Sequence, residues 1–203
     1  MSAFLARLAV DLRAASALEG VTVALGLVYV VLAVRRSRWC WVFGGLSSAG
    51  LAWLSARSAL PMQALLQAFY VAMAVYGFRR WSADRDAGGH VNVGWWPLPA
   101  HVAAWFAIAV FALLAANALA RYTHAAQPVL DAACTAGSLL ATWLAARARL
   151  ENWLYWIVVD AALGVLYARQ GLALVTLLYF AYLGMAAVGF VSWLRRLPRA
   201  PPP

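Results

Sequence analysis

Residues 33–81 read AVRRSRWCWVFGGLSSAGLAWLSARSALPMQALLQAFYVAMAVYGFRRW, and residues 145–193 read AARARLENWLYWIVVDAALGVLYARQGLALVTLLYFAYLGMAAVGFVSW. Aligned without a gap at an offset of 112 residues, 17 of the 49 pairs are identical. The identities include residue types that two alanine- and leucine-rich segments do not match by composition alone: Arg35 with Arg147, Trp41 with Trp153, Arg57 with Arg169, Tyr70 with Tyr182, Gly77 with Gly189 and Trp81 with Trp193. The chain therefore contains two copies of one structural unit.

The sequence in and around both copies is strongly apolar. Hydrophobic residues make up 66% of the 203 residues and charged residues only 11%, whereas a soluble domain carries about 25% charged residues. The apolar runs are about 20 residues long, which is the length that crosses a hydrocarbon core. The 16 arginines lie in short clusters between these runs, so they indicate membrane topology and not a nucleic-acid surface.

The apolar runs and their polar punctuation predict seven membrane-spanning helices. These are residues 17–34, 39–56, 60–79, 98–119, 126–146, 150–168 and 172–194. The predicted organisation is an N-terminal periplasmic segment over 1–15, a three-helix repeat over 16–81, a cytoplasmic loop over 82–97, a linker helix over 98–120, a second three-helix repeat over 125–194 and a cytoplasmic tail over 195–203. One helix between the repeats makes both run in the same direction. The predicted fold is an all-α integral membrane protein with two parallel three-helix bundles in a SWEET-like 3+1+3 order.

The arginines also predict the orientation. With seven spans, five arginines fall on the face of the N-terminus and eleven on the face of the C-terminus. Because arginine accumulates on the cytoplasmic side, the N-terminus is expected outside and the C-terminus inside. Tryptophans near the predicted span ends are interpreted as headgroup anchors: Trp39, Trp41, Trp81, Trp95, Trp96, Trp153 and Trp193.

Several chemistries are not expected. The chain has no lysine, which excludes a retinal Schiff base and a Walker motif. Its three histidines, His90, His101 and His124, are scattered, so neither a metal site nor another cofactor is expected. Cys40 and Cys134 lie far apart within apolar runs and are interpreted as packing residues. Charged residues interrupt any apolar core in the first fifteen residues, so no cleaved signal peptide is expected.

The sixth span opens with the segment most indicative of a binding site, ENWLYWIVVD over residues 151–160. On a helix, Asn152, Trp156 and Asp160 lie at i, i+4 and i+8 and form one stripe of amide, indole and carboxylate. Their counterparts in the first copy are small residues: Cys40, Gly44 and Ser48. A bulky polar wall opposite a small one suits an asymmetric ligand between symmetric bundles. The alternative is that the tryptophans anchor the helix and Asp160 pairs with a neighbour.

Further polar side chains line the predicted third and seventh spans. Gln63, Gln67 and Tyr70 share one face of the third span, and Tyr179 and Tyr182 lie on the seventh, where Tyr179 is the repeat counterpart of Gln67. Aromatic rings around a few amides suit a flat heterocycle, and a cationic ring in particular. The alternative is that these groups only join helices, as polar side chains in membranes commonly do. The stripe of Asp131, Thr135, Ser138 and Thr142 on the fifth span is interpreted as structural.

Two other classes of protein remain open at this point. An intramembrane aspartyl enzyme would use Asp131 and Asp160, but no catalytic motif flanks either acid. A signalling receptor or structural subunit is disfavoured because the sequence holds no sizeable extramembrane domain.

Taken together, these residues resemble the PnuC-type nicotinamide riboside transporters, whose relatives carry other B vitamins. The similarity covers most of the chain. It is clearest in Glu151-Asn152-Trp153-x-x-Trp156-x-x-x-Asp160, Leu166-Tyr167, Gly171-Leu172, Leu178-Tyr179 and Gly189 to Trp193, with Gln67, Tyr70, Tyr76-Gly77 and Trp81 in the first copy. In one departure, Gly44 stands where a second tryptophan would follow Trp41.

The resemblance implies facilitated diffusion of nicotinamide riboside across a bacterial cytoplasmic membrane for NAD biosynthesis, with thiamine or riboflavin as alternative substrates. It implies that a cytoplasmic kinase traps the substrate by phosphorylation, and that the protein forms a homotrimer. Asn152, Trp153 and Trp156 match the family's substrate motif, and Gln67 and Tyr70 match its polar positions on the third span. Asp160, Tyr179, Tyr182 and Gln63 complete the predicted substrate-binding set.

Overall fold

The computed structural model describes residues 16–57, 61–122 and 127–197. The helices of this part of the chain are α2 (Ala17–Val34), α3 (Cys40–Arg57), α4 (Pro61–Ala83), α5 (Leu98–Tyr122), α6 (Pro128–Ala146), α7 (Asn152–Gln170) and α8 (Ala173–Leu194). Each predicted span corresponds to one of them, which confirms the all-helical prediction. The predicted segment 1–15 and residues 198–203 of the tail lie outside the described residues, as do Arg7, Arg13, His124 and Arg199.

Local sequence explains where several helices begin and end. The Ser16 side chain accepts a hydrogen bond from the Glu19 amide, and the Glu19 carboxylate accepts one from the Ser16 amide, a capping box that starts α2. Pro128 opens α6, where its missing N–H costs nothing. Gly171 ends α7 with a left-handed φ of 75°, a conformation that glycine adopts without steric penalty.

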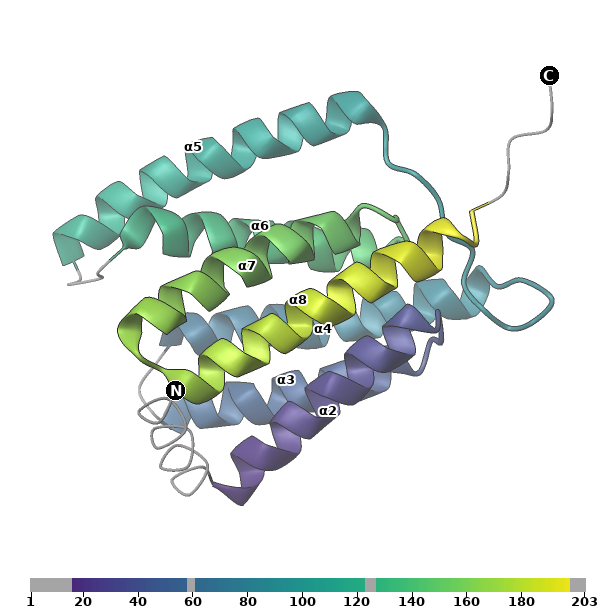
Figure 1. Cartoon of the computed structure of the whole chain (residues 1–203), viewed down its shortest axis with the longest axis horizontal. Coiled ribbons are helices and arrows are strands. Elements are labelled where there is room, and N and C mark those ends of the chain that lie inside the picture. The colour runs from purple at the N-terminus through teal and green to yellow at the C-terminus, as the bar shows by residue number, and fades with distance from the viewer. Residues whose placement is uncertain (1–15, 58–60, 123–126, 198–203) are drawn as a thin grey trace.

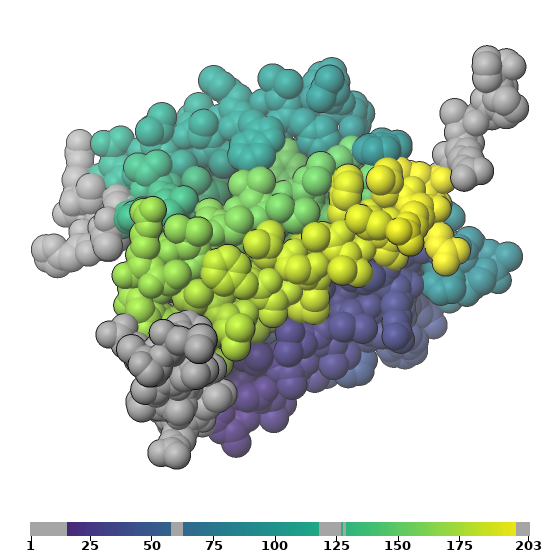
Figure 2. All heavy atoms as spheres, in the orientation of Figure 1, coloured from purple at the N-terminus to yellow at the C-terminus, as the bar shows by residue number. Residues whose placement is uncertain are grey.

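The helices pack in two neighbouring groups. α3 packs between α2 and α4, and α7 packs between α6 and α8. The groups meet where α2 contacts α8 and where α4 contacts α6. The α5 helix packs along α6, and side chains near its start also contact Tyr155 of α7. Figure 1 shows α5 at the edge of the bundle, and Figure 2 shows α8 crossing the visible face between α7 and α2. In Figure 1, α2 and α6 begin at the same end of the molecule, and α8 ends at the other.

Four helices are long and apolar enough, by length and composition, to cross a membrane among the described residues. They are Ala17–Val34, Leu98–Asn117, Val129–Ala146 and Ala173–Leu194. The spanning role of α3, α4 and α7 stays a prediction from the sequence. Those three helices carry buried polar side chains such as Gln67, Asn152 and Asp160, which lower their hydropathy. Apolar side chains on α5 are strongly exposed, with Leu98 at 76% and Phe106 at 72%, as expected of a lipid-facing surface.

Equivalent tryptophans join the two groups of helices. The Trp81 indole of α4 donates a 3.1 Å hydrogen bond to the Ala145 carbonyl of α6. The Trp193 indole of α8 donates a bond of the same length to the Ala33 carbonyl of α2. Trp81 and Trp193 are equivalent in the repeat, and so are Ala33 and Ala145. The same contact therefore occurs twice: once with the indole in the first copy of the repeat and once with the indole in the second.

Trp41, Trp81, Trp153 and Trp193 form a layer inside the protein, named here the tryptophan layer. Their exposed fractions are 4% or less. The rings of Trp41 and Trp81 meet edge to face at 5.5 Å, and those of Trp153 and Trp193 at 5.4 Å. Their interpretation as headgroup anchors is therefore wrong, because all four rings are buried and contact one another, and Trp41 and Trp153 pack against Gly77 and Gly189. Trp39 and Trp95 are more than half exposed, as an anchor would be.

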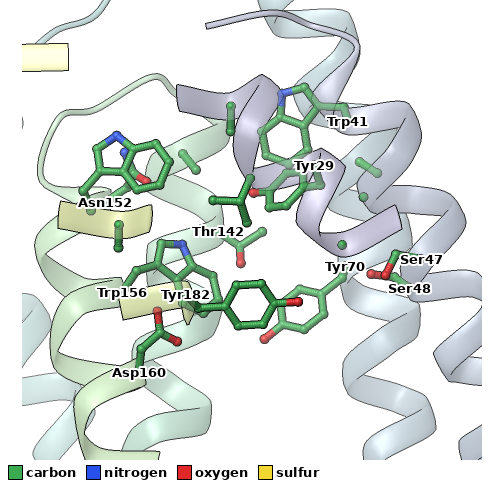
Figure 3. Close-up of a pocket in the computed structure, with 18 of the residues that line it drawn as sticks. Tyr29, Trp41, Ser47, Ser48, Tyr70, Thr142, Asn152, Trp156, Asp160 and Tyr182 are labelled. Atoms are coloured by element: carbon green, nitrogen blue, oxygen red, sulfur yellow. The ribbon is translucent and has the colours of Figure 1, made fainter. Parts of the chain in front are cut away.

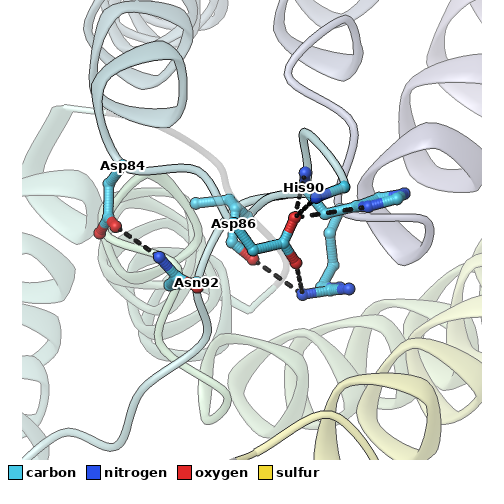
Figure 4. A network of polar contacts seen from close by, with 7 residues as sticks. Asp84, Asp86, His90 and Asn92 are labelled. Carbon is cyan, nitrogen blue, oxygen red and sulfur yellow. Dashed lines mark hydrogen bonds and ion pairs between the residues drawn. The ribbon is translucent and has the colours of Figure 1, made fainter.

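The loop over 84–97 joins the two groups at one end. The Val91 amide donates to the Arg36 carbonyl, and the Gly94 amide donates to the Ala148 carbonyl. Arg36 and Ala148 are again equivalent, and both adopt left-handed φ angles, of 58° and 52°. The Asp86 carboxylate accepts bonds from the amides of Gly88 and His90 and pairs with Arg36 (Figure 4). These contacts, the His90 amide first, lower the pKa of Asp86.

This end carries most of the arginines and is named the arginine-rich end. Its arginines are Arg35, Arg36, Arg38, Arg79, Arg80, Arg85, Arg147, Arg149, Arg195 and Arg196. The loop spans both groups of helices at this end, so it restrains their separation there.

The packing of glycine against tryptophan gives a matched pair of variants. A Cβ atom on Gly189 would overlap the Trp153 ring, whereas one on Gly184 of the same helix would meet nothing within 4 Å. Gly189→Ala should lower the free energy of unfolding by about 1–3 kcal/mol because the packed ring must shift. Gly184→Ala should be neutral or slightly stabilising because alanine favours helix. Thermal unfolding in detergent measures both, and equal effects would contradict the packing.

A candidate substrate cavity between the two groups of helices

A cavity of about 220 Å³ lies between the two groups of helices. α2, α3 and α4 line one side, α6, α7 and α8 line the other, and no α5 residue lines it. Its walls are largely aromatic and small apolar side chains with a few amides, hydroxyls and one carboxylate. Ligand pockets in proteins have this character: a mostly apolar lining with a few placed polar groups.

One wall is the stripe predicted on α7. Asn152, Trp156 and Asp160 all line the cavity, one helical turn apart (Figure 3). The Asn152 amide nitrogen donates a 2.6 Å hydrogen bond to the Arg149 carbonyl, so its orientation is fixed. Asp160 is 3% exposed, and no hydrogen bond or ion pair to its carboxylate is found among the described residues. The stripe therefore presents a fixed amide, an aromatic ring and an unpaired acid.

The opposite wall is not the empty surface that its small residues suggest. A Cβ atom on Gly44 would collide with the ring of Tyr29, so this ring covers the position equivalent to Trp156. Ser47 donates a 2.7 Å hydrogen bond to the Thr22 carbonyl, and Ser48 lies beside it (Figure 3). The two walls therefore have the same backbone plan and different side chains.

A hydrogen bond from one cavity residue crosses between the two groups of helices. The Tyr70 hydroxyl of α4 donates to the Ser138 hydroxyl of α6 over 3.0 Å. Ser138 in turn donates to the Thr135 carbonyl, and Thr142 donates to the Ser138 carbonyl. The predicted structural stripe on α6 therefore supports a cavity residue.

The tryptophan layer closes the cavity toward the arginine-rich end. All four of its members line the cavity, and the rings of Trp81 and Trp193 approach to 5.9 Å across the junction. The indole N–H groups of Trp41 and Trp153 have no hydrogen-bond partner among the described residues. An unpaired buried donor is costly, so a hydrogen-bond acceptor that reached either N–H group would stabilise it.

Most of the predicted site residues meet at this cavity. Those that line it are Gln67, Tyr70, Asn152, Trp153, Trp156, Asp160 and Tyr182. Tyr179 does not line it and instead stacks on Tyr167 at 5.3 Å, with an edge contact to Tyr182. Gln63 is exposed on α4, one turn before Gln67.

The sequence interpretation missed several lining residues. They are Tyr29, Trp41, Ser47 and Thr142. The identity of Trp41 with Trp153 in the repeat was a usable signal, since a binding role proposed for one copy applies to its counterpart. Tyr29 gave no such signal because its counterpart is Ala141.

Glu151, the first residue of the segment 151–160, makes its contacts with residues next to and within α5. One of its carboxylate oxygens accepts a 2.7 Å bond from the Trp96 amide and lies 3.3 Å from the His101 ring. The other ring nitrogen of His101 is 3.0 Å from the Tyr155 hydroxyl. These contacts hold the start of α5 against α7, outside the cavity.

A cavity between apolar helices, lined by aromatic rings and amides, is the arrangement expected of a membrane-embedded carrier of a small molecule. Comparison with known proteins agrees. Residues 16–195 match the family model described as nicotinamide mononucleotide transporter.

Two characterised relatives are similar over most of their length. The chain is 31% identical over 179 residues to the riboflavin/roseoflavin transporter RibM of Streptomyces davaonensis, covering 86% of this chain and 83% of that one. It is 25% identical over 203 residues to the nicotinamide riboside transporter PnuC of Escherichia coli, covering 87% and 84%. The crystal structure of the vitamin B3 transporter PnuC shares the fold, with a TM-score of 0.74, 21% identity and coverage of 97% and 88%.

The chain therefore belongs to the nicotinamide mononucleotide transporter family, that of the PnuC-type vitamin transporters. The resemblance seen in the sequence is confirmed. The protein is a multi-pass membrane transporter and not an enzyme, so the aspartyl hydrolase alternative is set aside. Asp131 is exposed in the first turn of α6, whereas Asp160 is buried in the cavity.

The reciprocal indole bonds predict paired losses of stability. Trp81→Phe and Trp193→Phe each remove one indole hydrogen bond, while the Ala145 and Ala33 carbonyls keep their backbone donors. Each variant should lower the free energy of unfolding by about 0.5–1.5 kcal/mol. The two losses should be similar because the contacts are equivalent. Trp53→Phe is the control, since Trp53 is 60% exposed. A loss from only one variant, measured by thermal unfolding in detergent, would contradict the reciprocal arrangement.

Proposed function

We propose that this protein carries nicotinamide riboside by facilitated diffusion across a bacterial cytoplasmic membrane, and that cytoplasmic phosphorylation then traps the substrate. The observation that carries the proposal is the α7 stripe of Asn152, Trp156 and Asp160 facing an aromatic wall in one small cavity. A flat ring binds between aromatic side chains, and a ribose offers hydroxyls to amides. Facilitated diffusion needs no energy-coupling domain.

We propose the SWEET-like 3+1+3 architecture for this transport. The two bundles are the repeats over 16–81 and 125–194, α5 is the linker helix, and the remaining predicted segments keep the bounds derived from the sequence. Two hydrogen bonds between equivalent residues of the repeats support this architecture: one from Trp81 to Ala145 and one from Trp193 to Ala33. Alternating access then follows from rocking one bundle against the other around the cavity.

The other residues of the predicted site have these proposed roles. Trp156, Trp153 and Tyr182 supply aromatic surface, and Asn152, Gln67 and Tyr70 supply hydrogen bonds. Tyr179 lies behind Tyr182 and positions it through their edge contact. Gln63 is exposed and does not line the cavity, so any contact that it makes with the substrate lies outside the cavity.

Riboflavin is the second candidate substrate. The 31% identity to a riboflavin/roseoflavin transporter favours it. The cavity favours the smaller nucleoside, because about 220 Å³ lies below the range of about 300–1,000 Å³ typical of drug-sized ligands. Thiamine remains an alternative because it also carries a cationic ring.

The partners we propose are the substrate, membrane lipid, a cytoplasmic kinase acting on the substrate and two further copies in a homotrimer. The kinase and the homotrimer come from the family resemblance. The strongly exposed apolar side chains of α5 support contact with lipid or with another copy.

Uptake into proteoliposomes with an entrapped nicotinamide riboside kinase and ATP tests the substrate. Nicotinamide riboside should accumulate as its phosphate, and Asn152→Ala or Trp156→Ala should reduce uptake at least about tenfold because each removes a central contact. Gln67→Ala should also reduce it, while Gln63→Ala, one turn away, should not. Entry of riboflavin or thiamine alone would refute the proposed substrate, and full uptake by the Asn152 and Trp156 variants would refute the site.

The orientation we propose places the N-terminus outside and the arginine-rich end in the cytoplasm. His90, in the loop over 84–97, is exposed, and both native cysteines are buried. In a His90→Cys variant, a membrane-impermeant maleimide should label inside-out vesicles and spare intact cells. Labelling of intact cells would show that the arginine-rich end lies outside and would contradict the proposed orientation.

A further inference from the structure

Asp160 is an acid without a partner at the centre of the molecule. It is 97% buried, since its exposed fraction is 3%, and its side chain points into the cavity (Figure 3). Among the described residues that line this cavity, none is arginine, lysine or histidine. Burying an ionised carboxylate without a partner is costly, so a positive group on a ligand would stabilise it where the described lining residues supply none.

The groups near Asp160 are aromatic and neutral. Its carboxyl group lies close enough to interact electrostatically with the side chains of Tyr70, Tyr179 and Tyr182, and with Cys134. The Tyr70 hydroxyl donates its hydrogen bond to Ser138, so it does not donate one to the Asp160 carboxylate. Trp156 lies one turn away on the same face. Aromatic faces attract cations as the carboxylate does, so both kinds of group favour the same ligand charge.

The repeat shows that this acid is specific to one wall. The position equivalent to Asp160 is Ser48, which also lines the cavity. The backbone plan shared by both walls therefore does not require a carboxylate. An acid retained on one wall, at the cost of burial, marks where one end of an asymmetric ligand lies.

We propose that Asp160 selects the substrate by charge, so that the cavity prefers a flat ring bearing a fixed positive charge, of the N-alkylated pyridinium type, over a neutral ring of the same shape. The proposal rests on the proposed function, because it assigns the charged ring of the carried nucleoside to this end of the cavity. Asp160 is thus a specificity-determining residue, and Asn152 and Gln67 bind the uncharged part of the ligand.

A matched pair of ligands tests the proposal. Nicotinamide riboside carries a pyridinium, and benzamide riboside has a neutral ring of nearly the same shape. Competition for uptake in proteoliposomes should show that the wild-type protein prefers the cation at least about tenfold, as expected for a buried charge pair. Asp160→Asn should remove most of this preference by weakening binding of the cation, with little change for the neutral analogue.

Two variants serve as controls. Asp160→Glu keeps the charge and should retain a preference for the cation. Asp131→Asn removes an exposed acid outside the cavity and should leave the preference unchanged. Thermal unfolding of each variant separates a loss of folding from a loss of selection, since the selectivity ratio is measured on the folded fraction.

The outcomes separate this proposal from the proposed function. Equal affinity of the wild-type protein for both ribosides, or an Asp160→Asn variant that keeps the preference, overturns charge selection and leaves riboside transport standing. Competition by riboflavin alone, with neither riboside bound, overturns both, because a neutral flavin would then occupy the cavity beside the acid.

Discussion

Two hydrogen bonds, from the Trp81 indole to the Ala145 carbonyl and from the Trp193 indole to the Ala33 carbonyl, hold the two groups of helices together. Between apolar surfaces in a membrane the hydrophobic effect gives little preference for one packing over another, so polar contacts and close packing decide it. Both bonds lie at the ends of their helices, beside the loop over 84–97. They fix the separation of the groups at one end, and the cavity occupies the space beyond the tryptophan layer.

The cavity combines a symmetric frame with an asymmetric lining. Gly77 and Gly189 each receive a tryptophan ring from the neighbouring helix in the same way. The two walls differ where side chains line the cavity: Gly44 lies under the ring of Tyr29 at the position of Trp156, and Ser48 takes the position of Asp160. The repeat gives the cavity two walls with equivalent backbone positions, and the side chains differ at a few of these positions.

The sequence predicted the parts of this account that depend on periodicity and on the repeat. The seven helices follow from apolar runs, and the α7 stripe follows from helical spacing, so both were accessible. The tryptophan layer was misinterpreted, because an indole near a span end satisfies the rule for headgroup anchoring whether it points outward or inward. Its direction is set by the facing glycines, and that pairing is visible only once the helices are packed. Tyr29 was missed for a similar reason, since it fills space that a glycine on another helix leaves free.

We propose that a small cationic nucleoside binds between the two groups of helices, beside Asp160. A structure of the protein determined with nicotinamide riboside tests this most directly. Ligand density is expected in the cavity, with the pyridinium against aromatic rings and nearest to Asp160, and the ribose within hydrogen-bond distance of Asn152. Ligand density between α5 and α7, or a cavity that stays without density at saturating ligand, would contradict it.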